Sequence, residues 1–218
     1  MYIDNTYFNG ELTIPNSQSY PNSTIDGNKV SLSQFIEEYE VELMTYALGY
    51  DLYSEFVEVF ENNGELKPGV DQKWVDFVNG KEYTIDGKKY KWKGLRYSEG
   101  TMKKSLIADY VYCKFLENYQ VTLAGTGMQS ESSKNSYKAS AIPKIVSTWN
   151  GFMNKYQGEQ GGIYPKIVST TYGSSVGIDW MTNRTAGYVS MYQYLMDMEE
   201  DFPNLEMGLF SAKNSFGL

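Results

Sequence analysis

The sequence predicts a mainly α-helical domain: a helical bundle with a β-hairpin insertion, an extended N-terminal arm and a C-terminal tail. Three observations carry this prediction. Apolar residues recur at intervals of three and four from Leu32 to Val59, which is the spacing of a buried helical stripe. A second broad apolar face runs from Leu106 to Phe115. Between the two faces, Asp86-Gly87 separates two β-prone stretches, the signature of a type I′ hairpin.

The first 80 residues are expected to form an arm followed by helices. Residues 1–30 are polar and rich in turn formers, which favours an extended arm with one short strand at most. Helices are predicted at about 31–48 and 51–61. Gly49 can adopt the left-handed conformation that ends the first of them, and Ser31 with Gln34 forms a capping box at its start. A third helix is predicted at about 71–79.

The helical domain is predicted to cover 31–204. After a hairpin at 81–92, we expect helices at about 101–119, 136–156 and 185–200, with Pro143 either in the first turn of the second helix or kinking it. Long Gly- and Ser-rich loops fall at 122–135 and 157–184, and loops of such length are usually functional or mobile. Residues 205–218 form a C-terminal tail whose apolar side chains are too sparse for a helix face.

Composition and charge limit the classes of function that the protein can have. A chain of 218 residues can bury one substantial core, and its 20 tyrosines supply the rigid, polar-tipped contact area that protein interfaces use. The alternative is that each tyrosine simply straddles core and surface. The formal net charge of −8 argues against a protein that grips nucleic acid, because phosphate neutralisation needs basic patches. One small basic cluster, on the predicted hairpin, comprises Lys88, Lys89, Lys91 and Lys93.

Most of the residue patterns that support catalysis are missing from the sequence. No histidine is present, which excludes Ser-His and Cys-His dyads and His-based metal sites. Residues 173–177 match the G-x-S-x-G pattern but lack its strand-to-helix context and an activating histidine. Cys113, the one cysteine, is expected to be a small buried hydrophobe. We therefore predict no enzyme, no catalytic residue, no cofactor and no metal, while a carboxylate-only Mg²⁺ or Ca²⁺ site at the acidic clusters 37–42 or 199–201 stays open.

The sequence also predicts where the protein is made. The start of the chain lacks a basic region followed by an apolar run, and no window reaches the ~18 apolar residues of a membrane span. A single cysteine allows no internal disulfide, which suits folding in the cytosol. We expect a soluble protein that is neither exported nor inserted in a membrane.

Several short stretches together resemble one protein family. They are FIEEYEVELMTYALGYDLYSEF at 35–56, Trp92-Lys93-Gly94-Leu95, SLIADYVY at 105–112, the Thr-Gly loop near Gly125, and NSFGL at 214–218. In this order they resemble head-to-tail adaptor proteins, also called connector, ring or neck proteins, of tailed bacteriophages of Bacteroidetes, including crAss-like phages. The long 157–184 segment departs from minimal adaptors.

The resemblance implies a structural virion protein rather than an enzyme. Such a subunit is mainly helical and assembles, as twelve copies, into a ring beneath the portal protein. The ring extends the DNA channel toward the tail, encloses DNA without reading its sequence, and offers a docking surface to neighbouring ring or tail proteins. Its location is the neck and tail region of the virion, after synthesis in the host cytoplasm. The alternative is a small acidic helical protein-binding or scaffolding module that acts in the cytosol.

The tail supplies the candidate partner-binding residues Phe210, Phe216 and Leu218. An extended segment is held by a partner when an aromatic anchor finds a pocket, so we expect these residues to dock on the portal or on an adjacent subunit. In the alternative, the tail folds back onto its own helical core.

Overall fold

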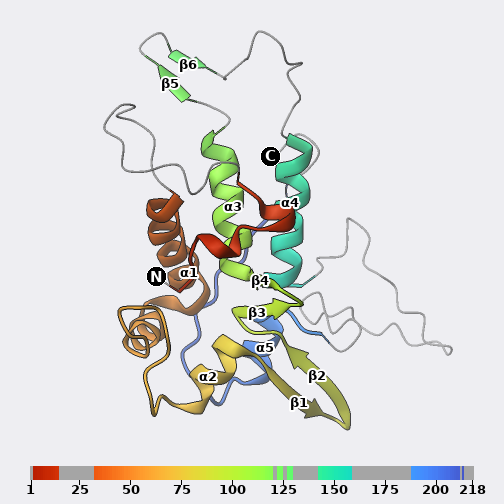
Figure 1. Ribbon diagram of the computed structural model, residues 1–218. Helices are drawn as coiled ribbons and strands as arrows, with labels where there is room; N and C mark the ends of the chain where they lie inside the picture. Colours follow the sequence, from red (N-terminus) through yellow and green to blue (C-terminus); the bar gives the residue numbers. More distant parts are fainter. Residues whose placement is uncertain are drawn as a thin grey trace, which may run out of the picture.

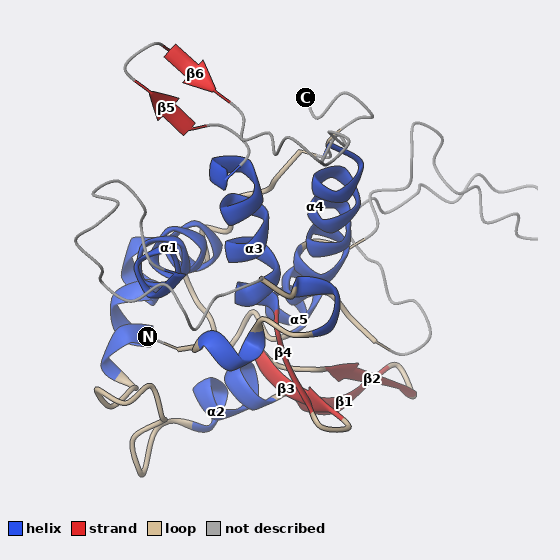
Figure 2. Ribbon diagram, turned by 45° about the horizontal axis from the view of Figure 1, so that its top comes forward, coloured by secondary structure: helices blue, strands red, loops and turns tan. Residues whose placement is uncertain are grey.

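The computed structural model describes residues 2–14, 32–119, 122–124, 127–129, 142–158, 188–211 and 213. In that part of the chain it has five α-helices and three two-stranded antiparallel sheets, so the domain is mixed α/β rather than plainly all-α. Helices α1 (Leu32–Glu58), α3 (Leu106–Tyr119) and α4 (Ile142–Tyr156) lie side by side (Figures 1 and 2). Helices α2 (Gln72–Asn79) and α5 (Met191–Asp197) lie with two hairpins at one end of this layer (Figure 1). The prediction of a helical domain with a β-hairpin is confirmed.

Helix α1 changes direction at Gly49, as the sequence predicts. The backbone there has φ 74° and ψ 171°, which breaks the helical geometry and favours glycine because a β-carbon is strained at this φ. Leu43 and Ala47 are buried before this point, and Leu52 and Phe56 after it. The predicted helices at 31–48 and 51–61 are therefore two halves of one long element, and Ser31 of the predicted capping box lies outside the described residues.

The predicted hairpin at 81–92 is present. Strands β1 (Lys81–Ile85) and β2 (Lys88–Trp92) pair with Ile85 opposite Lys88, and both residues of the turn between them have positive φ, as type I′ requires. The Trp92 indole N–H donates to the Phe77 carbonyl at 2.8 Å and so fixes the hairpin to α2.

A second hairpin replaces part of a predicted helix. Strands β3 (Arg96–Glu99) and β4 (Met102–Ser105) are paired, so the helix predicted at about 101–119 is wrong over its first residues and begins at Leu106. The physical reason is that the apolar stripe starts only at Leu106, while residues 102–104 are exposed or half-buried. The Ser105 hydroxyl accepts from the Ile107 N–H at 3.1 Å and marks the start of α3.

Helices α3 and α4 form the centre of the core. Tyr110 and Phe152 face each other with ring centroids 5.2 Å apart, and Cys113 is fully buried, which confirms the prediction for this cysteine. Pro143 lies in the first turn of α4, where a missing N–H costs no helical hydrogen bond. The predicted start of this helix, at 136–141, lies outside the described residues.

The last helix is shorter than predicted. Instead of covering 185–200, α5 covers Met191–Asp197, and its N-cap Ser190 accepts from the Gln193 N–H at 3.1 Å. Tyr188 precedes the helix and forms a parallel bridge with Lys91 of β2. This pairing extends the backbone at 188–190 and so prevents an earlier helix start. Residues 185–187 are outside the described part.

Residues 2–14 do not form the extended arm that the sequence predicts. They contain two short 3₁₀ helices, Asn5–Tyr7 and Gly10–Leu12, and bury five side chains against the helical layer. These are Tyr2, Ile3, Phe8, Leu12 and Ile14. Burial of this much apolar surface outweighs the turn-rich composition on which the prediction rested. Residues 15–30 of the predicted arm lie outside the described part.

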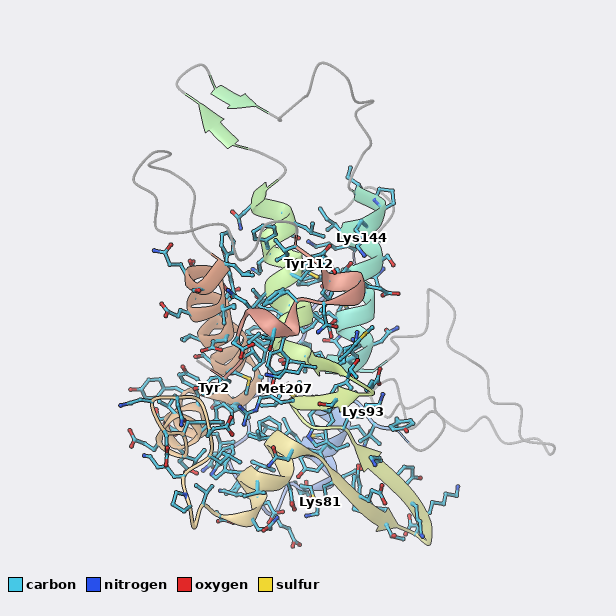
Figure 3. The ribbon with its side chains drawn as sticks, viewed as in Figure 1. Tyr2, Lys81, Lys93, Tyr112, Lys144 and Met207 are labelled. Carbon is cyan, nitrogen blue, oxygen red and sulfur yellow. The ribbon has the colours of Figure 1, made fainter. Side chains whose placement is uncertain are left out.

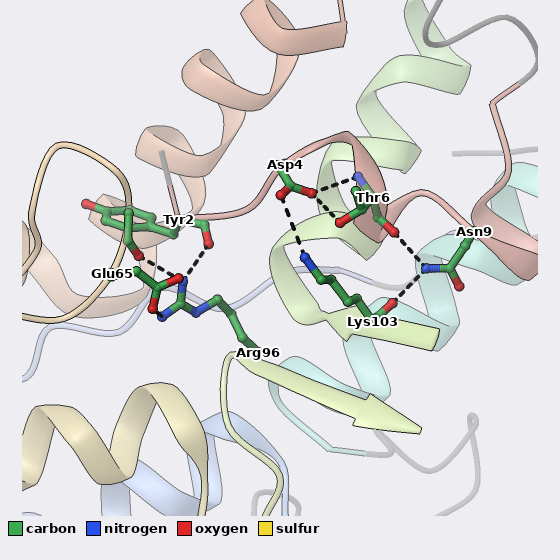
Figure 4. Close-up of polar contacts among 8 residues, drawn as sticks. Tyr2, Asp4, Thr6, Asn9, Glu65, Arg96 and Lys103 are labelled. Carbon is green, nitrogen blue, oxygen red and sulfur yellow. Dashed lines mark hydrogen bonds and ion pairs between the residues drawn. The ribbon is translucent and has the colours of Figure 1, made fainter. Parts of the chain in front are cut away.

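Polar contacts complete this attachment. The Arg96 guanidinium donates to the carbonyls of Tyr2 (3.2 Å) and Gly64 (2.8 Å) and lies near Glu65 (Figure 4). On α4, the Lys144 ammonium donates to the Glu11 carbonyl at 3.0 Å (Figure 3). The N-terminal segment is thus fixed by side chains far from it in sequence.

The predicted long loops are described only in small part. In 122–135, strands β5 (Thr122–Ala124) and β6 (Gly127–Gln129) form a short hairpin, and the other residues of that range lie outside the described part. Of 157–184, only residues 157 and 158 are described. None of the described helices combines the length and the apolar character needed to cross a bilayer.

Candidate protein-binding surfaces

The C-terminal segment 205–211 lies on the chain's own helices, with Phe210 as its anchor. The Phe210 ring is surrounded by aromatic rings from three helices, with centroids between 4.6 and 5.6 Å away. These rings belong to Tyr46 of α1, Tyr110 of α3, and Trp149, Phe152 and Tyr156 of α4. Most pairs are tilted or edge-on, the arrangements that aromatic quadrupoles favour.

Hydrogen bonds to the tail backbone hold it on both sides of Phe210. The Gly208 N–H donates to the Tyr46 carbonyl at 2.8 Å, and the Tyr46 hydroxyl donates to the Leu209 carbonyl at 2.7 Å. The Gln157 amide accepts from the Phe210 N–H at 2.8 Å and donates to the Phe210 carbonyl at 2.9 Å. Because neutral side chains satisfy these backbone groups, the segment is bound much as a peptide ligand would be.

Of the three predicted partner-binding residues, the structure describes only Phe210. Phe210 is packed against its own core, as the fold-back alternative describes, rather than presented to a partner. Phe216 and Leu218 lie outside the described residues, so their docking stays a prediction. The fold-back also requires a small residue at Gly208, because a β-carbon there would lie 2.3 Å from the Tyr46 ring, a requirement that the sequence prediction did not use.

A cleft of about 290 Å³ lies between the hairpins, α4 and the segment before α5. The Lys93 ammonium lies there between two rings, 5.1 Å from the centroid of Tyr97 and 4.8 Å from that of Tyr188. Glu99 pairs with Lys93 at 2.7 Å. Burial raises the pKa of Tyr97 to about 12. Both lysines that line the cleft are paired, Lys93 with Glu99 and Lys155 with Asp109, so the cleft offers aromatic faces and favours an apolar or aromatic side chain over an anion.

The buried titratable groups serve the fold. Burial raises the pKa of Cys113 to about 12, so its sulfur stays a thiol at neutral pH. Burial also raises the pKa of Asp109, although the Lys155 ammonium at 2.6 Å opposes that shift. Glu40 is buried and accepts the Tyr2 N–H at 2.9 Å. Among the residues placed in the structure, no group of three or more His, Cys, Asp or Glu is arranged to hold a metal ion.

Charge is distributed unevenly along the chain. Residues 31–66 contain nine Asp and Glu and no Lys or Arg, whereas the whole chain has 27 acidic and 19 basic residues. The other residues thus carry 18 acidic and 19 basic side chains, so a formal charge of −9 belongs to this one segment. In contrast, the two hairpins (81–104) carry eight basic and three acidic residues.

The acidic segment presents exposed carboxylates on both halves of α1, and we call this surface the acidic face. It comprises Glu37, Glu38, Glu42, Asp51, Glu55 and Glu58. Glu42 pairs with Lys114 and Glu55 with Lys73, but Glu37, Glu38 and Asp51 form no ion pair within the described part of the chain. Tyr50, with 76% of its surface exposed, lies beside these carboxylates. An exposed aromatic ring among charges is the composition of a protein-binding surface.

The basic counterpart, which we call the lysine hairpin, is β1–β2 with its turn. Lys91 pairs with Glu82 at 2.7 Å, and Lys81 pairs with Asp76 at 2.9 Å. Lys88 and Lys89, next to the turn, are exposed and have no carboxylate partner among the residues described. The hairpin is anchored at its base, where the Tyr83 hydroxyl donates to Asp197 of α5 at 2.6 Å.

Comparisons of this chain with protein-family models, with curated proteins and with solved structures give no match.

Proposed function

We propose that the chain is a structural subunit of a phage neck: a head-to-tail adaptor that docks on the portal protein as part of a homo-oligomeric ring and extends the DNA channel toward the tail. The proposal starts from the resemblance of five short stretches to adaptor proteins of Bacteroidetes phages. Under this proposal the protein is not an enzyme, because an adaptor acts only through its contacts with other molecules.

One observation carries the proposal: stretches that bear the resemblance build a single core, although they are far apart in sequence. The stretch 35–56 contributes Leu43 and Phe56, 92–95 contributes Trp92 and Leu95, and 105–112 contributes the fully buried Ile107 and Val111. Short sequence stretches that resembled a family only by chance would not need to pack together in one core. Their convergence supports the view that they record a shared fold.

The charge of the chain suits a subunit that surrounds DNA without holding it. With a net charge of −8, long-range repulsion opposes tight binding to phosphate, and a ring that DNA must slide through benefits from weak contacts. Contacts to the portal and to neighbouring rings then depend on protein surfaces, of which the acidic face and the aromatic cleft beside Lys93 are candidates.

Coexpression with the portal protein of the same phage genome tests the proposal. We expect the chain to co-purify with the portal and to appear as an added ring by electron microscopy, and its peptides to be found in purified virions by mass spectrometry. The matched control is coexpression with the portal of an unrelated tailed phage, which lacks the complementary surface.

Two results would contradict the adaptor function. One is absence of the chain from purified virions in which the portal is readily detected. The other is a protein that stays free of its own portal at every concentration tested, as the alternative of a cytosolic protein-binding module expects.

A further inference from the structure

We propose that neighbouring copies of this chain associate head to tail, with the lysine hairpin of one copy seated on the acidic face of α1 of the next. This inference rests on the proposed function, and it names the two surfaces through which the ring would form.

The first support is that most of the acidic face lacks a cation: only Glu42 and Glu55 form ion pairs among the described residues, with Lys114 and Lys73. Helix α1 carries seven acidic residues and no Lys or Arg between Leu32 and Glu58. Glu38 and Glu42 are one turn apart and repel each other, and Glu55 and Glu58 lie near the C-terminal end, where the helix dipole is also negative. Lys114 beside Glu42 and Lys73 beside Glu55 offset part of this repulsion within the subunit. Further cations from a second copy would offset the rest.

The second support is that the lysine hairpin presents cations with too few carboxylates to neutralise them. Lys88 and Lys89 flank the Asp86-Gly87 turn at the far end of β1–β2 and are exposed. A two-stranded hairpin is marginal in water, and this one is fixed chiefly at its base, through Trp92 and Tyr83. Contact with a second chain would stabilise its tip as well.

The third support is the placement of the two surfaces. Helix α1 and the β1–β2 hairpin lie on opposite sides of the domain in both ribbon views (Figures 1 and 2). The hairpin therefore cannot reach the acidic face of its own copy. Two different, complementary surfaces on opposite sides give a head-to-tail contact, and such contacts close into rings when the rotation per subunit allows it.

The acidic face also offers an anchor for such a contact. Tyr50 exposes 76% of its surface and Val41 exposes 44%, both on α1 among the carboxylates. Tyr50 is next to Asp51 in sequence and Val41 is next to Glu42, so each places an exposed apolar group near a carboxylate, as in an interface where anchors lie among polar contacts. The occupant to which we commit is a second copy of this chain, because its charge complements the face.

A pair of charge reversals tests the contact. Variant E37K/E38K makes the acidic face basic, and variant K88E/K89E makes the hairpin acidic. Each variant alone should self-associate about tenfold more weakly than the wild type, by sedimentation velocity at low salt over a range of concentrations. Mixed in equal amounts, the two variants should recover association, because each basic surface then meets an acidic one on the other variant. The matched control for E37K/E38K is E199K/E200K, which raises the net charge by the same amount but lies after α5 and should associate as the wild type does.

Crosslinking locates the contact directly. A carbodiimide, which joins carboxylates to lysines, should link Lys88 or Lys89 to residues 37–58, and a mixture of ¹⁴N- and ¹⁵N-labelled protein shows whether the link joins two copies. Failure of the mixed variants to recover association, or links within one copy only, would overturn the inference. So would loss of duplex DNA binding by K88E/K89E with unchanged self-association, since the hairpin would then contact nucleic acid. None of these outcomes bears on presence in virions, which tests the adaptor function separately.

Discussion

The N-terminal segment 2–14 and the C-terminal segment 205–211 both lie against the helical layer, but different chemistry holds each one. The N-terminal segment buries five apolar side chains, and charged groups meet its backbone: Glu40 accepts the Tyr2 N–H, and Arg96 donates to the Tyr2 carbonyl. The C-terminal segment has one aromatic anchor, Phe210, and neutral partners such as Gln157 and Tyr156.

This difference predicts how each end of the chain can be detached from the helical layer. Attachment of the N-terminal segment is spread over many apolar contacts and depends on pH through its carboxylates. Attachment of the C-terminal segment depends on one ring and on close backbone approach, so a single substitution should free it without a change in charge. Substitutions in the two segments test this contrast, and the largest effect is expected at the C-terminal anchor.

Removal of the anchor should have the largest effect. We expect Phe210→Ala to lower the free energy of unfolding by about 3 kcal/mol, because the ring contacts five aromatic side chains and its loss leaves a cavity among them. Urea denaturation of the isolated chain measures this. Leu209→Ala, at an exposed neighbouring position, is the control and should cost less than about 0.5 kcal/mol.

Unchanged stability of Phe210→Ala, together with weakened binding to the portal, would reverse this interpretation. Phe210 would then be a docking residue whose packed position is only one of two states. Deletion of residues 205–218 gives the same distinction, because a self-packed tail stabilises the subunit and a docking tail does not.

Close backbone approach gives the next largest effect. A β-carbon at Gly208 would lie 2.3 Å from the Tyr46 ring, so Gly208→Ala should displace the tail and cost about 2 kcal/mol. Gly151, in α4, has no atom within 4 Å of its would-be β-carbon, and Gly151→Ala should instead stabilise the helix by about 0.5–1 kcal/mol. Equal effects of the two substitutions, measured by thermal unfolding, would show that the tail does not lie on Tyr46.

Helical periodicity and turn chemistry were sufficient to predict much of the fold. The break at Gly49, the type I′ turn at 86–87 and the buried face of α3 each follow from a local pattern that tertiary contacts reinforce. Boundaries were less predictable. The β3–β4 hairpin has short strands with few apolar residues, so only its pairing distinguishes it from the start of a helix.

The positions of the chain ends could not be read from local patterns. Whether residues 2–14 extend or pack depends on Arg96 and Glu40, which lie dozens of residues away. The same holds for Phe210, whose partners come from three helices. The run of carboxylates that forms the acidic face can be recognised in the sequence. Only the three-dimensional structure shows how this face and the lysine hairpin are placed relative to each other.

The pH dependence of the N-terminal attachment should follow Glu40. Burial raises the pKa of this carboxyl although the Tyr2 N–H favours the charged form, so the folded state binds its proton more tightly than the unfolded chain does. Stability from this group is therefore greatest below the unfolded pKa and falls as pH rises toward the folded pKa. Glu40→Gln should remove that fall, so the variant gains relative to the wild type as pH rises above the unfolded pKa of about 4.3. Urea denaturation at several pH values measures this difference. Glu38→Gln, at an exposed position, is the control. If the free energy of unfolding varied with pH in the same way for the wild type and for Glu40→Gln, the prediction would be contradicted.

The smallest expected effect has the opposite pH slope. At Asp4, desolvation raises the carboxyl pKa, but hydrogen bonds from the Thr6 side chain and N–H and the nearby Lys103 ammonium outweigh it, so the pKa is lowered (Figure 4). The stability that this carboxylate contributes is present above the unfolded pKa and is lost as pH falls through the folded pKa. Because Asp4 caps only a single 3₁₀ turn, Asp4→Asn should cost about 0.5 kcal/mol near neutral pH. That cost should shrink on acidification, whereas the exposed Asp51→Asn should show no such trend. A cost that does not shrink as pH falls below the unfolded pKa of about 3.9 would mean that the cap acts through shape rather than charge, and the Asp4 carboxylate would then not govern how the N-terminal segment is released.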